Sequence, residues 1–146
     1  MKSKKDYIYV VIQIILFISY ILPIRNTNIN LPEWLRYSGL LVLALGIVLG
    51  LVASLQLNTK LSPFPTPVSN GRLLTSGAYK IARHPIYTAV IFLGFGYALY
   101  QASLSKIIVA LLLLSLFYFK SQYEEQLLSE KFPEYSDYKK KTRRFI

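Results

Sequence analysis

The chain has 146 residues, of which 53% are hydrophobic, yet it carries a formal net charge of +10. Apolar and charged residues must therefore be segregated along the chain, a pattern that suits a lipid bilayer better than water. The absence of cysteine excludes disulfides and thiolate chemistry, and with His84 as the single histidine we expect no metal site. We also expect no nucleic-acid partner, because the basic residues lie beside hydrophobic segments, where Lys and Arg mark the cytoplasmic side and contact anionic lipid.

Two hydrophobic segments occupy the first part of the chain. The first, residues 7–24, follows three lysines and ends without a small-residue cleavage pattern, so we interpret it as a retained anchor and not a signal peptide. The second, residues 37–57, contains Gly46, Gly50 and Ser54 at four-residue spacing. Small residues at that spacing allow another helix to approach closely, and a ligand lying against the glycines is the alternative.

A polar region separates these segments from two more. Residues 58–85 are rich in proline and glycine, which predicts a structured loop. Hydrophobic segments follow at residues 86–100 and 105–119. Because no helix breaker occurs before Pro133, we expect the last helix to continue out of the membrane into a polar region, residues 120–146.

The distribution of positive charge predicts the orientation of these segments. An even number of spans places the N-terminus, the long loop and the tail on one side, with 14 of the 17 Lys and Arg residues there and 3 opposite. Both termini should therefore be cytoplasmic. We predict an all-α polytopic membrane helix bundle, a single domain with about four transmembrane helices and a cytoplasmic C-terminal tail. The basic run at residues 139–144 is expected to contact anionic lipids.

Two clusters carry the residue types needed for chemistry, and the predicted topology brings both to one membrane face. They comprise Gly77, Tyr79, Arg83, His84 and Tyr87 before the third segment, and Glu124 and Glu125 after the fourth. An arginine can fork onto a carboxylate while a glutamate holds an ammonium, so the clusters suit a zwitterionic ligand, with the tyrosine rings packed on it. The alternative is a set of interfacial charges and an aromatic belt. Pro85 favours a site, because it fixes the backbone where the helix enters the membrane.

A longer pattern joins the two clusters. Between Gly71 and Ala89 the chain reads GRLLTSGAYKIARHPIYTA, and two hydrophobic segments later come Glu124 and Glu125, followed by Leu128, Phe132, Tyr135 and Tyr138. This combination resembles the isoprenylcysteine carboxyl methyltransferase family, whose wider relatives include the phospholipid methyltransferases. The family often has glycine where this chain has Ala89. We therefore expect the alanine methyl group to leave less room for another group to approach the backbone at this position.

The resemblance implies an integral membrane methyltransferase that uses S-adenosylmethionine as cofactor. Its pocket would open to the cytosol for the cofactor and to the bilayer for a lipophilic acceptor. The resemblance assigns catalytic roles to Arg83, Glu124 and Glu125, and cofactor-binding roles to these three together with Gly77, Tyr79, His84 and Tyr87. In this hypothesis the arginine grips the cofactor carboxylate, and one glutamate holds its amine or ribose.

We expect the acceptor to be a carboxylate, which would give a methyl ester, and N-methylation of a phospholipid or other amine is the alternative. A carboxylate such as an isoprenylcysteine-like group is already ionised and needs no general base, whereas a phospholipid or other amine must lose a proton, for which His84 and both glutamates are candidates. A different class of function is a non-catalytic membrane scaffold or lipid-binding protein whose basic tail recognises anionic headgroups. The sequence makes no prediction of oligomeric state.

Overall fold

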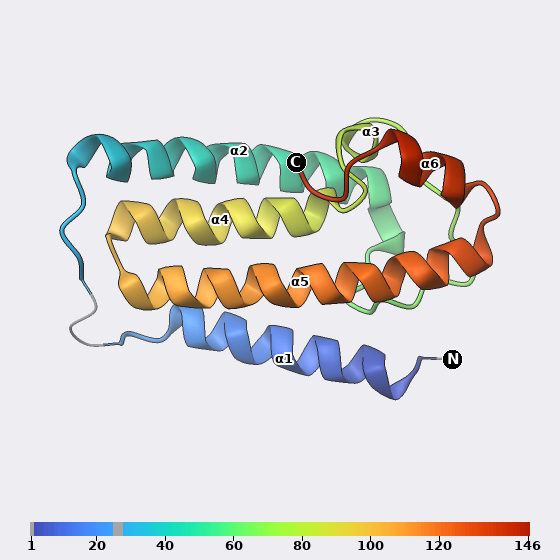
Figure 1. Ribbon diagram of the computed structural model, residues 1–146, viewed down its shortest axis with the longest axis horizontal. Helices are drawn as coiled ribbons and strands as arrows, with labels where there is room; N and C mark the ends of the chain where they lie inside the picture. Colours follow the sequence, from blue (N-terminus) through green and yellow to red (C-terminus); the bar gives the residue numbers. More distant parts are fainter. Residues whose placement is uncertain (1, 25–27) are drawn as a thin grey trace.

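Four long helices run side by side in the computed structural model, which describes residues 2–24 and 28–146 apart from the side chain of Thr59. They are α1 (Lys4–Ile21), α2 (Glu33–Leu57), α4 (Pro85–Gln101) and α5 (Leu104–Lys131). The 3-10 helix η1 (Asn58–Lys60) and the short helices α3 (Ala78–Ile81) and α6 (Tyr135–Lys141) lie at one end of the bundle (Figure 1). The described residues form no strand, only two isolated bridges, so the all-α prediction is confirmed for them.

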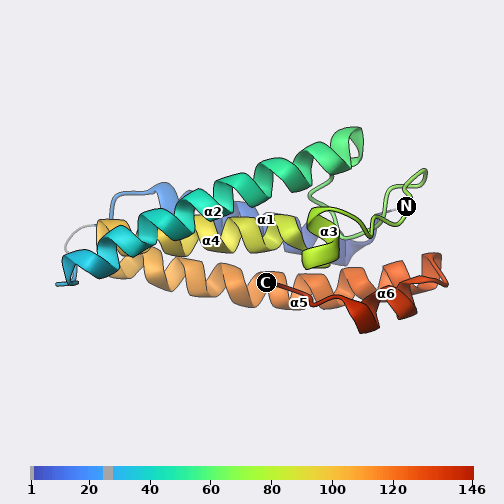
Figure 2. The ribbon, with the colours of Figure 1, turned by 90° about the horizontal axis from the view of Figure 1, so that it is seen from above.

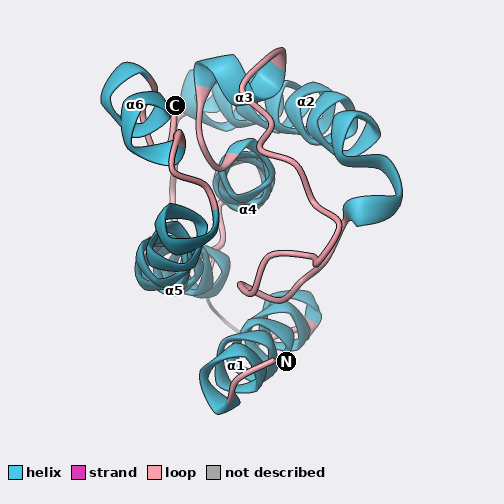
Figure 3. Ribbon diagram, turned by 90° about the vertical axis from the view of Figure 1, so that its right-hand side faces the viewer, coloured by secondary structure: helices cyan, strands magenta, loops and turns pink. Residues whose placement is uncertain are grey.

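Successive long helices alternate in direction. As a result the N-terminus, the long loop after α2 and helix α6 all lie at the same end of the bundle (Figure 1). Seen from that end, the loop crosses from α2 towards α1 (Figure 3), where the Thr66 hydroxyl donates a hydrogen bond to the buried carboxylate of Asp6. The loop is therefore attached to the bundle and is not a free connection.

The helix boundaries agree with the predicted segments apart from a few differences, each of which has a physical reason. Helix α1 ends at Ile21, earlier than predicted, because Leu22 precedes Pro23 and adopts the extended conformation that proline imposes on its neighbour. Helix α5 continues beyond its apolar part to Lys131, as predicted, and stops before Pro133. The region predicted as a loop contains η1 and α3 in addition.

Glycines allow the backbones of α2 and α4, which cross each other in Figure 2, to come into contact. The buried residues of α2 are Gly39, Gly46 and Ala53, which recur every seven positions. A Cβ atom added to Gly96 of α4 would lie 2.6 Å from the carbonyl oxygen of Gly39, and one added to Gly46 would lie 2.9 Å from Cβ of Phe92. Seven-residue spacing is the one that keeps small residues along a single seam between two helices.

The predicted four-residue stripe is therefore only partly right. Gly46 belongs to the seam, whereas a Cβ atom on Gly50 would meet Cβ of Ala89 at 3.3 Å and Ser54 is half-buried. Ala89, at the position where the related family often has glycine, is 2% exposed. Its methyl group faces α2 and does not narrow the cavity described below.

The outer faces of the bundle are apolar. Large hydrophobic side chains are exposed on three of the long helices, among them Ile8, Val11 and Ile15 on α1, Leu41, Val48 and Leu55 on α2, and Ile108, Leu111 and Phe119 on α5. Contiguous apolar surface of this kind marks a membrane or partner interface. Within the described residues, α2 and α5 are long and apolar enough to cross a bilayer.

Candidate functional site

A cavity of about 370 Å³ opens at the end of the bundle where the loop, α3 and α6 lie. Five of the seven predicted site residues line it, namely Tyr79, Arg83, His84, Tyr87 and Glu124. Gly77 and Glu125 lie outside its lining. A second cavity of about 390 Å³, lined largely by the proline-rich loop, adjoins the first. The two share six lining residues, namely Leu57, Ser62, Arg72, Leu74, Glu124 and Leu128.

The backbone around Arg83 and His84 is fixed from two sides. His84 is the N-cap of α4, and Pro85 occupies the first turn, where its missing N–H costs no helical hydrogen bond. The backbone N–H groups of Arg83 and His84 donate to the carbonyl oxygens of Arg143 and Arg144, at 2.8 and 3.1 Å. The C-terminal tail therefore forms part of the wall that carries these two side chains.

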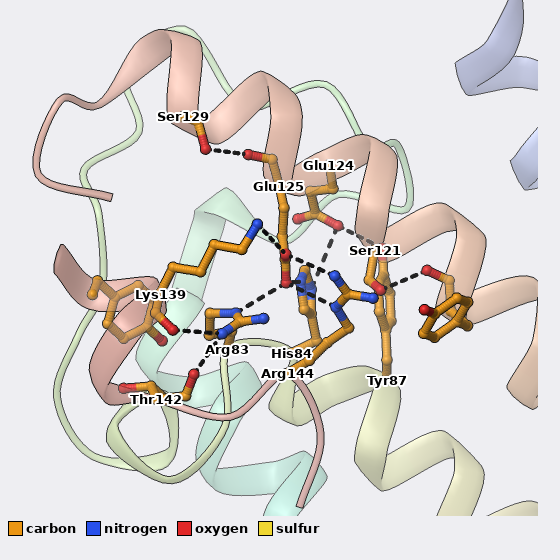
Figure 4. A network of polar contacts seen from close by, with 12 residues as sticks. Arg83, His84, Tyr87, Ser121, Glu124, Glu125, Ser129, Lys139, Thr142 and Arg144 are labelled. Atoms are coloured by element: carbon orange, nitrogen blue, oxygen red, sulfur yellow. Dashed lines mark hydrogen bonds and ion pairs between the residues drawn. The ribbon is translucent and has the colours of Figure 1, made fainter. Parts of the chain in front are cut away.

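Glu125 is the centre of an ion network (Figure 4). Its carboxylate, 2% exposed, accepts hydrogen bonds from Arg83 Nε at 3.0 Å, His84 Nε2 at 3.1 Å and Arg144 Nη2 at 3.0 Å. Lys139 Nζ lies 3.6 Å away. Since four cationic or protonatable side chains surround one carboxylate, Glu125 joins α5 to the start of α4, to α6 and to the residues after α6.

The electrostatics of this network keep Glu125 charged. It lies beyond the apolar part of α5, which ends at Phe119. Burial alone would raise the pKa of the carboxyl, but hydrogen bonds from His84, Arg144 and Arg83 hold that pKa well below its usual range. The carboxylate is therefore an ionised structural anchor at neutral pH.

Arg83 is also held by the tail. Its Nη1 atom donates to the carbonyl oxygens of Lys139 and Thr142 at 2.9 and 2.5 Å (Figure 4). Together with the bond to Glu125, these contacts fix the guanidinium at the cavity wall. The arginine brings positive charge to the site in a single, rigid position.

Glu124 has a different environment from its neighbour. Its side chain is 25% exposed, it lines both cavities, and its Oε2 atom accepts a hydrogen bond from the Tyr87 hydroxyl at 2.9 Å. His84 Nδ1 lies 3.8 Å from the same oxygen. Of the two glutamates, Glu124 is the one whose carboxylate can reach a ligand.

Aromatic rings pack in a row at the cavity wall. The ring of Tyr87 stacks on that of His84, with centroids 5.3 Å apart, and on that of Phe117, with centroids 4.6 Å apart. Both pairs of rings are nearly parallel.

A hydroxyl group attaches α6 to α3, because the Tyr138 hydroxyl donates a hydrogen bond to the carbonyl oxygen of Tyr79. Burial raises the pKa of Tyr138 to about 12, so this hydroxyl stays protonated and remains a donor at neutral pH.

Gly77 acts on the site indirectly. It adopts φ of +60°, which favours glycine, and a Cβ atom there would lie 2.0 Å from Nε2 of Gln56. The Gln56 side chain accepts from the N–H of Ala78 at 2.9 Å and so caps the start of α3. Gly77 thereby positions the helix that carries Tyr79.

Several site residues escaped the sequence analysis. Arg144 and Lys139 belong to the basic run that we expected to contact lipid, yet both contact Glu125. Tyr135, quoted above as part of a motif but given no role, lines the cavity with a buried hydroxyl that has no hydrogen-bond partner among the described residues. Lys120 and Gln13 line the same cavity, and no motif pointed to them.

The fold and the site define an all-helical protein with apolar outer faces and, at one end of its bundle, a cavity that is lined by charged, aromatic and apolar side chains. Within the described parts of the chain, no group of three or more His, Asp or Glu side chains is placed to hold a metal ion. No curated protein matches the chain. A family model described as phospholipid methyltransferase matches residues 34–135, a range that includes both clusters.

The chain belongs to the phospholipid methyltransferase family. This confirms the predicted resemblance to the isoprenylcysteine carboxyl and phospholipid methyltransferases, and it supports methyltransferase activity. The matched range begins in α2 and ends at Tyr135, so α1 and most of α6 lie outside it.

Proposed function

We propose that the protein transfers a methyl group from S-adenosylmethionine to a lipophilic acceptor at the membrane surface. The proposal is based on one observation. In this member of a methyltransferase family, Glu124, Tyr87 and Arg83 line one cavity, which lies at the polar end of an apolar helix bundle. Such a position is accessible both to a soluble cofactor and to an acceptor dissolved in the bilayer.

The cavity residues fit S-adenosylmethionine. Glu124 is the carboxylate available to the cofactor ammonium, and Arg83 provides positive charge for its carboxylate. The unpartnered hydroxyl of Tyr135 is a further donor. His84, Tyr79 and Tyr87 line the space for adenine or the methionine chain, whereas Glu125 holds the wall and does not contact the ligand. The cofactor would supply a methyl group on a sulfonium, and the chain's task is alignment and exclusion of water.

Two acceptor classes follow from this site. A carboxylate such as an isoprenylcysteine-like group would give a methyl ester without any general base. The family match favours the second class, N-methylation of a phospholipid amine. That reaction requires loss of a proton, for which His84, the other predicted base that lines the cavity, is the candidate while Glu124 holds the cofactor ammonium.

The membrane arrangement is part of the proposal. Four spans, over about residues 7–24, 37–57, 86–100 and 105–119, would place both termini, the loop 58–85 and residues 120–146 in the cytoplasm. The exposed apolar side chains of α1 support a position against lipid. Lys140, Lys141 and Arg143 remain exposed for anionic headgroups, although Arg144 and Lys139 are engaged by Glu125.

Cofactor binding provides the first test. We expect purified protein in neutral detergent to bind S-adenosylmethionine, and Glu124→Gln to weaken binding about tenfold in titration calorimetry, because a charge-assisted contact to the ammonium is lost. Glu130→Gln, on the exposed face of the same helix, is the matched control and should bind as the wild type does. Equal binding by both variants would remove Glu124 from the cofactor site.

The product identifies the acceptor class. Membranes containing the protein are incubated with cofactor labelled in the methyl group, and the labelled lipid is treated with mild base. Release of the label indicates a methyl ester, whereas retention indicates an N-methyl product. A non-catalytic scaffold would transfer no label and bind no cofactor.

A further inference from the structure

Lys120 is a buried lysine in the wall of the cavity. It directly follows the apolar part of α5, at the level where lipid headgroups meet the hydrocarbon layer in the proposed arrangement, and its exposed fraction is 0%. It lines the same cavity as Arg83 and Glu124. Lys120 and Glu124 are four residues apart on one helix, so they lie on the same face about one turn, ~5 Å, apart.

The partners of this ammonium are neutral. Lys120 Nζ donates to Oε1 of Gln13 at 2.6 Å and to the carbonyl oxygen of Pro63 at 2.7 Å, and it lies 5.3 Å from the ring centroid of Tyr87. Among the described residues, no carboxylate lies within ion-pair distance of it. A lysine ammonium has three N–H donors, and these contacts occupy two of them.

A buried ammonium without a counter-charge is costly, and buried charges in proteins are usually paired. Burial lowers the pKa of Lys120 to about 8, while the charges of Glu124 and Asp6 act in the opposite direction. The side chain is therefore still largely protonated at neutral pH. The cavity wall thus carries a positive charge that is hydrogen-bonded to neutral groups and is not in direct contact with the carboxylates of Glu124 and Asp6 that stabilise it.

We propose that Lys120 binds the anionic group of the methyl acceptor, a carboxylate or the phosphodiester of a lipid headgroup. This inference rests on the proposed function, since it names the acceptor as the source of the anion. An acceptor anion at Lys120 would lie one helical turn from Glu124, next to the proposed position of the cofactor. The acceptor's alkyl chains could then extend along the apolar surface of the bundle.

A purely structural role is the alternative, because Lys120 also joins α1 to the proline-rich loop. The chain offers a matched lysine for comparison. Lys106, at the opposite end of α5, donates to the carbonyl oxygen of Tyr20 and lies 4.8 Å from that residue's ring centroid, but it lines neither cavity. A substitution at Lys106 therefore removes the same kind of structural contact without touching the site.

Binding of amphiphilic probes tests the proposal. Wild-type protein, K120M, K120R and K106M are purified in dodecyl maltoside, and each is titrated with dodecanoate, with didecyl phosphate, with uncharged dodecanol and with S-adenosylmethionine. We expect the wild type to bind at least one anion more tightly than dodecanol. K120M should weaken that binding about tenfold, which corresponds to ~1.4 kcal/mol, whereas K120R and K106M should retain it. The anion that binds more tightly indicates whether the group recognised is a carboxylate or a phosphodiester.

The outcomes separate the two proposals. Equal anion binding by K120M and wild type, or equal weakening in K120M and K106M, would overturn the role of Lys120. If the wild type does not bind S-adenosylmethionine, the proposed function is overturned instead, because binding of that ligand does not depend on Lys120. If K120M does not yield folded protein, K120Q, which keeps a donor for Gln13 or Pro63, gives the same comparison.

Discussion

A single carboxylate, Glu125, connects three stretches of the chain: its own helix, the start of α4, and the C-terminal residues from Lys139 to Arg144. Arg83 and His84 reach it from the start of α4, and Arg144 reaches it from the tail. Its neighbour Glu124 faces the cavity instead. Adjacent residues of a helix point ~100° apart, so one glutamate can hold the wall while the next contacts a ligand.

Glu125→Gln should destabilise the folded protein by about 3 kcal/mol at neutral pH, because it leaves several buried or half-buried cations without their common counter-charge. The carboxyl's pKa is depressed in the fold, so its contribution is present above the unfolded value of 4.5 and is lost as pH falls below it. Thermal unfolding of wild type and variant should therefore converge on acidification. A stability difference that stays constant down to pH 4 would contradict this assignment of the ionised form.

Helix packing depends on the absence of side chains at the seam between α2 and α4. The backbone atoms there are so close that even a methyl group requires the helices to separate. Because the start of α4 carries His84 and Tyr87, the packing of this pair also determines where the site residues lie.

Gly96→Ala should lower the free energy of unfolding by about 2 kcal/mol, since its Cβ would lie 2.6 Å from backbone atoms of Gly39 and Leu43 that cannot give way independently. Gly94→Ala is the control on the same helix, where the new atom would meet Cβ of Ala110 at an ordinary 3.5 Å. Denaturation in neutral detergent measures both. Equal effects would mean that helix propensity, and not backbone contact, determines stability here.

Most of the charged side chains of the molecule lie at one end, and this predicts their side of the membrane. The chain contains no cysteine, so single cysteines can be introduced without background. In intact cells, a maleimide reagent that cannot cross membranes should label Gln101→Cys and leave Ser69→Cys and Ser136→Cys unlabelled. The reverse labelling pattern would reverse the proposed orientation, and labelling of all three positions would rule out the spans.

Much of this architecture could be predicted from the sequence. Four apolar segments predict four long helices, and their even number places the motif containing Arg83 and the pair of glutamates at one end. The direction of each glutamate could not be predicted, because it depends on the rotation of α5 against its neighbours. The contact of Arg144 with Glu125 could not be predicted either, because a basic run beside a membrane is typical of a lipid-facing surface.

The seam between α2 and α4 illustrates the same limit. Glycine spacing of four residues predicts close contact at Gly46, but the contact follows every seventh position and includes Gly39. A regular pattern in one helix does not specify which of its faces packs against the partner helix. The packing depends on the residues of both helices, here on Gly96 opposite Gly39.

The pairing of the tail with Arg83 and His84 also has a consequence for biosynthesis. A ribosome makes Glu125 before Arg144, so the carboxylate cannot acquire this arginine until the end of α5 and all of α6 have been synthesised. The cavity wall can close only after residue 144 has emerged and folded back across the bundle. Until then the cavity lacks the part of its wall that residues 142–144 provide, so the last residues made complete the site.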